Sequence, residues 1–535
     1  MLLTIPSATS ECISRANFLI DELLLPAVFP HHVTRLQTRE THISWVLLTG
    51  PFAYKIKKSV KFPFIDTTSL AKRRELCEHE LRLNRRFAPD LYVDVVAITR
   101  EPAGLRIGGQ GKIIEYAVRM KQFDESEELC SLLDRGAVDN SEIVDLAQRL
   151  AEFHGSAPIA VASSDFKHTN ALRDAVLGNL ATLISHLNGI AGLTDLGRLS
   201  DWTHDCLHES IVHFRQREEC GFIRECHGDL HARNVVRWQG QLLPFDCLEF
   251  DPALRWIDVM NDAAFLVMDL ISHGRADLAY SFLNRYLETS GDYAGVRLLP
   301  FYAIYRALVR AMVDALAAEG VHADNSELTR RLRQRVHTAT QFMDRPAPML
   351  IIMYGASGSG KSWLSEQLAG SLAAIRIRSD VERKRLARIQ RTHLSGTGIG
   401  KGIYTVEFSH RTYAHLLECA QSCIEGRFNT IVDAAFLHRE DRRMFQDFAT
   451  YHRVDYTIIA CEADAEVMIQ RINARQAVHS DASEAGVDVL ENQLTRIDPL
   501  DHDERAHLIA ADTTSPRVAP DTIAALRRRS TNRKL

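Results

Sequence analysis

The chain has 535 residues, which is more than one hydrophobic core organises, because single cores stop growing at roughly 250–300 residues. Its 46% hydrophobic and 25% charged residues are typical of a folded protein and exclude extended disorder. A net charge of −5 provides no overall attraction to a polyanion, so nucleic acid is not expected as the main partner.

The N-terminal sequence lacks the basic start and continuous apolar core of a signal peptide, and no apolar stretch reaches the roughly 20 residues that cross a bilayer. Ten cysteines are scattered without a C-x-x-C pair, which favours reduced thiols over disulfides or a zinc site. These features predict a cytoplasmic protein without a membrane partner. They leave the oligomeric state open.

Alternation of apolar and polar residues predicts a small sheet at the start of the chain. Its strands are expected at residues 33–36, 43–48, 52–57 and 112–120. Between the last two, the pattern over residues 73–87 becomes helical. Mostly helical patterns follow, including residues 143–155, so a small sheet with one helix is expected to precede a mainly helical lobe.

Helical patterning continues to about Phe342, after which the sequence DRPAP at 344–348 interrupts any helix. From Met349 onward strands and helices alternate, which predicts a parallel sheet covered by helices. The chain is therefore expected to consist of a domain at 1–343, a linker at 344–348 and a domain at 349–535.

The sequence HGDLHARN occupies residues 227–234, and Asp246 follows a strand-like segment. In protein kinases a catalytic Asp precedes a metal-binding Asn by five residues, and a further Asp on the next loop binds the metals. Asp229, Asn234 and Asp246 have this spacing. Asp229 would accept the proton of an attacking hydroxyl, while Asn234 and Asp246 would offer oxygen ligands to Mg²⁺ beside ATP.

These residues resemble the aminoglycoside phosphotransferase and choline kinase superfamily, whose loop carries H-G-D-x-H-x-x-N. The resemblance covers roughly residues 30–335 and implies a bilobal, protein-kinase-like fold. It implies that the turn at 38–44 covers the ATP phosphates, although this turn lacks the glycine-rich signature. Asp258 and Asp262 are similar to carboxylates that brace the catalytic loop in that family, with helix-surface aspartates as the alternative.

The resemblance also implies an ion pair at the ATP site. Lys55 lies where the superfamily places an A-x-K lysine on its third strand, so it would contact the α- and β-phosphates. Lys57 is the competing candidate, because residues two apart share one face of a strand. The carboxylate partner is expected to be Glu80, with Glu78 and Glu75 as alternatives.

The second half contains GASGSGKS, a complete G-x-x-x-x-G-K-S pattern between an apolar strand and an amphipathic helix, which is the context that this motif requires. The residues expected to bind ATP are Gly355, Ala356, Ser357, Gly358, Ser359, Gly360, Lys361 and Ser362. Backbone N–H groups would surround the phosphates, Lys361 would reach the β- and γ-oxygens, and Ser362 would bind Mg²⁺.

Two further strand-like segments lead into Asp380 and Asp433. Ligands of open α/β sheets bind at the carboxyl ends of the strands. Asp433 is therefore expected to support Mg²⁺, and Asp380 to act as the base on a substrate hydroxyl, with Arg383 binding the substrate. A helix N-cap is the alternative for Asp380.

Arg471 and Arg475 share a helix face before a polar segment, which suits a lid that brings Arg475 onto the transferring phosphate; a solvated helix is the alternative. This half resembles the group of zeta toxins, polynucleotide kinases and small-molecule P-loop kinases. The tandem looks like bacterial bifunctional aminoglycoside phosphotransferase/ATP-binding proteins. Residues 394–398 approach the L-S-G-G-Q signature of transporter ATPases, but they lie too close to Lys361 and too far before Asp433.

The expected fold class is thus α/β and α+β in two domains, a bilobal kinase-like domain and a P-loop domain with a parallel sheet and flanking helices. The expected function is Mg²⁺- and ATP-dependent phosphorylation of a small-molecule hydroxyl, with an aminoglycoside-like acceptor implied by the resemblance alone. One alternative is a nucleotide-sensing regulator in which one module binds ATP without turnover. Another is a polynucleotide 5′-kinase in the second half.

Overall fold

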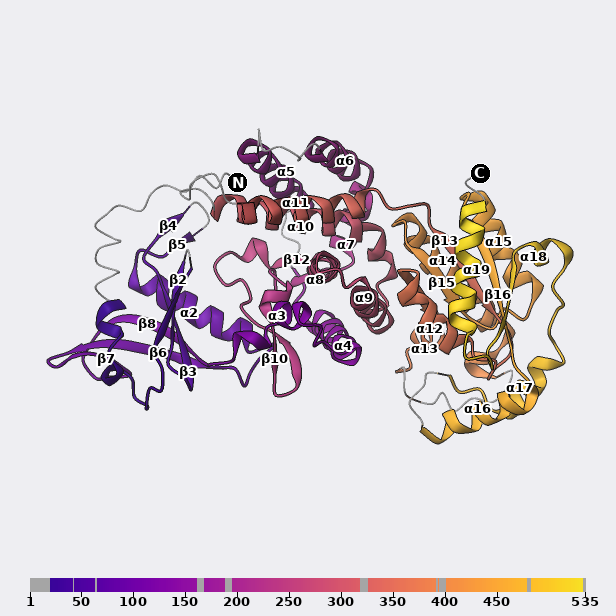
Figure 1. Cartoon of the computed structure of the whole chain (residues 1–535), viewed down its shortest axis with the longest axis horizontal. Helices are drawn as coiled ribbons and strands as arrows, with labels where there is room; N and C mark the ends of the chain where they lie inside the picture. Colours follow the sequence, from indigo (N-terminus) through magenta and orange to yellow (C-terminus); the bar gives the residue numbers. More distant parts are fainter. Residues whose placement is uncertain are drawn as a thin grey trace. The chain divides into compact units, whose positions relative to one another are not determined.

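The computed structural model describes residues 20–41, 43–62, 65–160, 168–187, 195–317, 326–390, 393, 401–478 and 483–532. The chain divides into two compact units (Figure 1). The first unit comprises Met1–Leu146, Ser156–His273 and Phe301–Thr340, and the second comprises Ala147–Gly155, Gly274–Pro300 and Gln341–Leu535. Among the described residues, every helix is too short or too polar to cross a membrane.

The first unit begins with an antiparallel sheet of order β1-β2-β3-β8-β6-β7. Its strands are β1 (Gln37–Glu40), β2 (Ser44–Leu48), β3 (Phe52–Lys57), β6 (Tyr92–Glu101), β7 (Gly104–Ile107) and β8 (Lys112–Lys121). The short strands β4 (Lys61–Phe62) and β5 (Ile65–Asp66) follow β3 in the sequence and pair with each other. Helix α2 (Leu70–Asn84) begins at Ser69, whose side chain caps the helix by accepting from the N–H of Lys72, and packs against β8 and β6. The strand predicted at 33–36 is wrong, since the first strand is β1.

The rest of the first unit is mainly helical, as expected. Its helices are α3 (Leu129–Asp134), α4 (Asn140–Ser156), α5 (His168–Leu187), α6 (Asp195–Glu209), α7 (Ile211–Glu219), α8 (Val259–Ser272), α10 (Leu299–Ala317) and α11 (Ser326–Met343). Residues Ala147–Gly155 of α4, the first two residues of α10 and the last three of α11 are assigned to the second unit. Helix α8 is apolar on nearly all sides and is buried from Val259 to Leu270, so it forms the centre of this lobe.

Two small strand pairs position the polar residues of the first unit. Strands β10 (Val235–Trp238) and β11 (Gln241–Pro244) form a hairpin, and β9 (Ile223–Glu225) pairs with β12 (Trp256–Asp258). Gln239 and Gly240 connect the hairpin with φ of 51° and 79°. Positive φ at both central residues is typical of a tight two-residue turn. The segment that reads as one strand in the sequence is therefore two, and it connects the HGDLHARN loop to Asp246.

The second unit contains a parallel sheet of order β14-β15-β13-β16-β17. Its strands are β13 (Met349–Tyr354), β14 (Ala374–Arg378), β15 (Asn429–Asp433), β16 (Asp455–Glu462) and β17 (Leu508–Asp512). The helices that follow or separate them are α12 (Lys361–Ser371), α13 (Ser379–Leu386), α14 (Val406–Glu425), α15 (Arg439–Tyr451), α16 (Ala465–Val478), α17 (Val487–Leu494), α18 (His502–Ala506) and α19 (Val518–Asn532).

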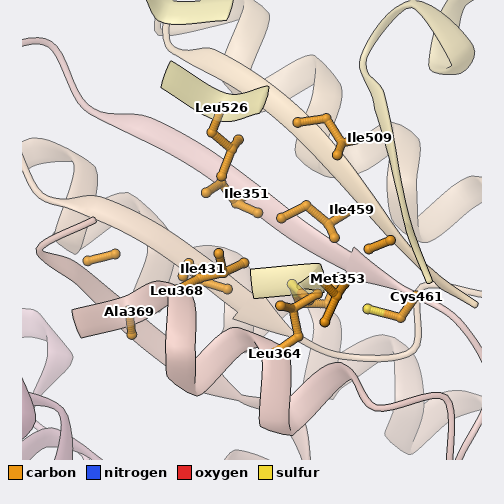
Figure 2. Packing of buried hydrophobic residues seen from close by; sticks show 13 residues of the cluster. Ile351, Met353, Leu364, Leu368, Ala369, Ile431, Ile459, Cys461, Ile509 and Leu526 are labelled. Atoms are coloured by element: carbon orange, nitrogen blue, oxygen red, sulfur yellow. The ribbon is translucent and has the colours of Figure 1, made fainter. Parts of the chain in front are cut away.

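Helices cover both faces of this sheet, which explains the continuous apolar run of β13. Figure 2 shows one face, where Ile351 and Met353 of β13 pack against Leu364 and Leu368 of α12 and where Leu526 of α19 closes the cluster. Helices α14 and α15 contact the strands as well. This core holds the start of α12, and with it the glycine-rich loop, against the carboxyl end of β13.

Two elements of the second unit precede the predicted linker. They are α9 (Ala276–Ser290) and the short helix η5 (Tyr293–Leu298). The side chain of Asn284 donates to the carbonyl oxygen of Ala374 at 3.0 Å and accepts from the N–H of Arg376 at 2.7 Å. Asn284 thereby satisfies backbone groups of the edge strand β14, and α9 covers that edge of the sheet.

Candidate active sites

The HGDLHARN loop of the first unit brings Asp229 and Asn234 together. The amide nitrogen of Asn234 donates to Asp229 Oδ2 and to the Asp229 carbonyl oxygen, both at 3.0 Å. The amide oxygen of Asn234 accepts no hydrogen bond from the described residues. The pair therefore presents a carboxylate and a neutral oxygen ligand from a single loop.

Asp246 and Lys55 meet although they lie far apart in the chain. Lys55 Nζ lies 2.5 Å from Asp246 Oδ1 and 2.9 Å from Glu80 Oε1. Asp246 has a φ of 60°, a left-handed conformation that Asp tolerates better than most residues. The alternative carboxylates lie at the surface, where Glu78 pairs with Arg74. Strand β3, helix α2 and the loop after β11 thus deliver one lysine and two carboxylates to the same place.

Lys57 belongs to the same cluster but is buried more deeply. Its Nζ lies 2.5 Å from Glu80 Oε2 and also pairs with Glu249. Only 1% of the Lys57 side chain is exposed, compared with 11% of Lys55. Burial works to raise the pKa of Glu80, but the charges of Lys55 and Lys57 outweigh it and lower that pKa. Glu80 is therefore an ionised bridge between the two lysines, and Glu249 is a member that the sequence analysis did not identify.

Helix α8 braces the catalytic loop through two buried carboxylates. Asp262 accepts hydrogen bonds from the backbone N–H groups of His227 at 3.0 Å and Gly228 at 2.9 Å. Asp269, one position before the end of the buried stretch, accepts from the N–H of Ala232 at 2.9 Å. The bracing expected of Asp262 is present, and Asp269, which the sequence analysis did not identify, performs the same function farther along the loop.

Asp258 has a different environment. It is 1% exposed, so it is not a helix-surface residue, and its carboxylate caps α8 by accepting from the N–H of Met260 at 2.8 Å. It also pairs with Arg217 at 2.6 Å and accepts from the hydroxyl of Tyr302 at 3.0 Å. These contacts join α7, α8 and α10, so Asp258 supports the lobe rather than the loop itself.

The surroundings of Asp229 favour its ionised form. His231 Nε2 lies 3.4 Å from Asp229 Oδ2 and 3.1 Å from a guanidinium nitrogen of Arg310. Burial works to raise the pKa of Asp229, but the charges of His231 and Arg310 outweigh it, so the pKa is lowered. Burial lowers the pKa of His227, whose Nε2 donates to the carbonyl oxygen of Phe245 at 2.9 Å. The loop therefore combines a charged Asp229 with a neutral, structural His227.

In the second unit, the glycine-rich loop depends on backbone conformations that favour glycine. Gly355, Gly358 and Gly360 have φ of 145°, 80° and 87°. A Cβ atom on Gly358 would lie 2.6 Å from the carbonyl oxygen of Met468. Lys361 Nζ donates to the carbonyl oxygen of Ala356 at 2.7 Å, across the loop. The loop is thus a cradle lined by backbone at the start of α12, which fits the phosphates of a nucleotide.

Two oxygen ligands suited to Mg²⁺ lie beside this cradle. Ser362 is in the first turn of α12, and Asp433 is the last residue of β15. Ser365 Oγ donates to Asp433 Oδ2 at 3.2 Å, which ties the carboxylate to α12. A hydroxyl and a carboxylate are the donor set that Mg²⁺ takes in P-loop proteins. Burial lowers the pKa of Lys361, and the Asp433 charge opposes that change.

A cavity of about 1230 Å³ is lined by most of the predicted residues of the second unit, but Gly355, Ala356 and Ser359 are not among its lining residues. Its lining includes Lys361, Ser362, Asp380, Arg383, Asp433 and Arg475. The guanidinium of Arg383 donates to the carbonyl oxygen of Ile403 at 2.7 Å and to Ser409 Oγ at 3.2 Å, so it fixes the wall of the cavity. Arg475 donates to the carbonyl oxygen of Ala485 at 2.7 Å. Residues 394–398 and part of the predicted lid, 479–482, lie outside the described residues.

Comparisons with known proteins match part of the second unit and, separately, most of the chain. A family model described as an AAA domain matches residues 350–500. Uncharacterized proteins of Mycobacterium tuberculosis and Mycobacterium bovis are 29% identical over 449 residues, which is 84% of this chain and 88% of each relative. The chain therefore shares most of its length with these relatives.

Solved structures match each part separately. A choline/ethanolamine kinase family protein from Mesorhizobium loti is 13% identical, covers 63% of this chain and 96% of its own, and has a TM-score of 0.38. A gluconokinase from Sinorhizobium meliloti is 21% identical, covers 35% of this chain and 97% of its own, and has a TM-score of 0.26. Because these TM-scores are below 0.5, the fold is assigned from strand order and connections: a kinase-like sheet with a helical lobe, followed by a P-loop domain.

Proposed function

We propose that the first unit transfers the γ-phosphoryl group of ATP to a hydroxyl group of a small molecule. The observation that supports this most directly is the convergence of Lys55, Glu80 and Asp246, with Asp229 and Asn234 in contact on the adjoining loop. A purely structural ion-pair cluster would not require Asp246, whose side chain is 43% exposed, or the Asn234 amide oxygen, which accepts no hydrogen bond from a described residue. The finer proposal of an aminoglycoside-like acceptor rests on the resemblance of HGDLHARN.

Each residue of the first site has a separate task in this proposal. Lys55 binds the α- and β-phosphates and is held by Glu80. Asn234 and Asp246 would hold Mg²⁺, which neutralises charge on the transferring phosphoryl group when it is bound. Asp229, kept ionised by its neighbours, orients the acceptor hydroxyl and accepts its proton as the oxygen attacks phosphorus.

For the second unit we propose a second Mg·ATP-dependent phosphotransferase. Backbone N–H groups of residues 355–360 and Lys361 bind the phosphates, and Ser362 and Asp433 would hold Mg²⁺. Asp380 lines the same cavity as the base on a second acceptor, and Arg475 approaches the transferring phosphate. The shared cavity supports these assignments, because the phosphate cradle and the Asp380 carboxylate line the same cavity.

The test uses the full chain with γ-labelled ATP and a metabolite extract. Asp229→Asn is expected to lower transfer by the first site at least about a hundredfold, because it removes the base, and to leave nucleotide binding there intact. Lys361→Ala is expected to remove nucleotide-dependent transfer by the second site. The double variant should transfer no label, so wild-type transfer by the double variant would refute both assignments. Undiminished transfer by one single variant would instead assign that site a binding role without turnover.

A further inference from the structure

The cavity of the second unit extends beyond the glycine-rich loop to a wall formed by α13, α14 and the start of α15. Asp441, in the first turn of α15, lines this wall and is only 7% exposed. Within the described part of the chain, no hydrogen bond or ion pair engages its carboxylate. Burying a carboxylate without a partner costs free energy, so its position at a cavity indicates a ligand that supplies the missing donor.

The charged groups around Asp441 do not supply that donor. His438, His410, Glu440 and Arg383 are the groups whose charges act on it, and burial raises its pKa to about 6 in spite of the two histidines. Arg383 directs its guanidinium to Ile403 and Ser409.

The hydroxyl of Tyr413, also in the wall, accepts from the N–H of Phe436 at 3.1 Å. Asp380 lines the same cavity, and its carboxylate also lacks a hydrogen-bond or ion-pair partner among the described residues. The cavity therefore presents the carboxylates of Asp380 and Asp441, with Glu440, His410 and His438 beside Asp441, while the guanidinium of Arg383 is already committed to the wall.

We propose that Asp441 binds the acceptor of the second unit by accepting a hydrogen bond from a hydroxyl or ammonium group. This inference rests on the phosphotransferase function proposed above. The acceptor is then a neutral or cationic small molecule with two donor groups, a hydroxyl at Asp380 and a second donor at Asp441. An acceptor whose group at Asp441 is a phosphate or carboxylate is disfavoured, because the Asp441 carboxylate would repel it.

The reaction at this site balances as an ordinary phosphoryl transfer. The acceptor oxygen forms a bond to the γ-phosphorus, the bond between that phosphorus and the β,γ-bridging oxygen breaks, and the hydroxyl proton passes to Asp380. The products are a phosphate ester and ADP. Asp441 takes no proton from the reacting hydroxyl and contributes by holding the acceptor in place.

The experiment uses the full chain carrying Asp229→Asn, so that only the second site transfers label from γ-labelled ATP. A metabolite extract is separated by ion exchange into anionic, cationic and unretained fractions. Label is expected to be transferred to the unretained fraction or to the cationic fraction. Transfer to the unretained fraction indicates a hydroxyl donor at Asp441, and transfer to the cationic fraction indicates an ammonium donor. Transfer to the anionic fraction alone would overturn the inference but not the kinase function. Transfer to no fraction would contradict the kinase function and the acceptor site with it.

The role of Asp441 itself is tested by Asp441→Asn in the same chain. The acceptor concentration for half-maximal transfer is expected to rise at least about tenfold, because a hydrogen bond to a charged group is lost, while the KM for ATP stays within about twofold. Asp447→Asn is the matched control, because Asp447 is an exposed residue of the same helix. Equal acceptor dependence in the two variants, or a parallel rise in the KM for ATP, would overturn the assignment.

Discussion

At the scale of single residues, the most informative group is Asp441. Its pKa is raised from 3.8 to about 6, mainly by burial. The folded state therefore binds the proton more tightly than the unfolded state, and stability falls as pH rises from about 4 to 6. Above that range the penalty is constant and is at most about 3 kcal/mol, since one pKa unit corresponds to about 1.4 kcal/mol.

Asp441→Asn is accordingly expected to raise the melting temperature of the second unit at pH 8 and to change it little at pH 4. Thermal unfolding at the two pH values measures the difference. Asp447→Asn, in the same helix but 73% exposed, should change neither melting temperature by a comparable amount. Equal stabilisation by Asp441→Asn at both pH values would show that its carboxylate is not held with a raised pKa.

The two lysines of β3 show what residue patterns can and cannot decide. Both project from one face of the strand and both reach Glu80, so periodicity alone left Lys55 and Lys57 as alternatives. The tertiary contacts separate them, because Lys55 also meets the loop residue Asp246 whereas Lys57 pairs with the buried Glu249. The motif HGDLHARN was recognisable because its residues are close together in the sequence. Glu249 could not be recognised in this way, because it joins the cluster through its contact with Lys57, which is 192 positions away.

Different consequences are expected from removing each lysine. Lys57→Met should lower the free energy of unfolding by about 3–5 kcal/mol, because it leaves Glu249 buried without its partner. Lys55→Met should be less destabilising, because Glu80 keeps Lys57, but it should weaken ATP binding to the first site. Urea unfolding and nucleotide titration distinguish the two. A greater loss of ATP affinity in Lys57→Met would reverse the assignment.

At the scale of elements, strands β2, β3 and β8 lie close to the predicted ranges, whereas β1, β6 and β7 were not predicted, although β6 and β7 carry buried residues. Strand β1 has the polar sequence QTRE and no buried residue, so it lacks the alternation that signals a strand. Its position is set instead by the turn in which the N–H of Thr41 donates to the carbonyl oxygen of Ser44 at 2.8 Å.

Helix α9 is the element whose position matters most for the second site. Its Glu288 is 6% exposed and accepts from Arg378 at 3.1 Å, and Arg378 Nε lies 3.9 Å from Asp433 Oδ2. Arg376, 3.9 Å from Glu288, donates to the carbonyl oxygen of Ser362 at 3.0 Å. Glu288 thus contacts two arginines, of which Arg376 bonds the Ser362 carbonyl oxygen and Arg378 lies near the Asp433 carboxylate.

Glu288→Gln in the full chain is expected to raise the Mg²⁺ concentration for half-maximal transfer by the second site about tenfold. Metal-free nucleotide binding should stay unchanged, which a general loss of structure would not allow. Glu425→Gln is the control, because Glu425 pairs with Arg297 of η5 at 2.5 Å and does not line the cavity. The same Mg²⁺ dependence in both variants would count against a positioning role for Glu288.

At the scale of the whole molecule, the chain contains two compact units, and each contains one set of residues suited to Mg·ATP. The alternation of strands and helices after Met349 predicted the parallel sheet correctly. The sequence did not indicate that Gly274–Pro300 belongs to the second unit, because α9 and η5 have helical patterns like their neighbours and their destination depends on tertiary packing. Tests of either unit therefore use the full chain in preference to a fragment that begins near residue 345.

Calorimetric titration of the full chain with a non-hydrolysable ATP analogue and Mg²⁺ measures whether the chain has two independent nucleotide sites. We predict two nucleotides bound per chain, falling to one in Lys55→Met and to one in Lys361→Ala. A single nucleotide bound to the wild-type chain, or no loss of binding in either variant, would exclude two independent sites.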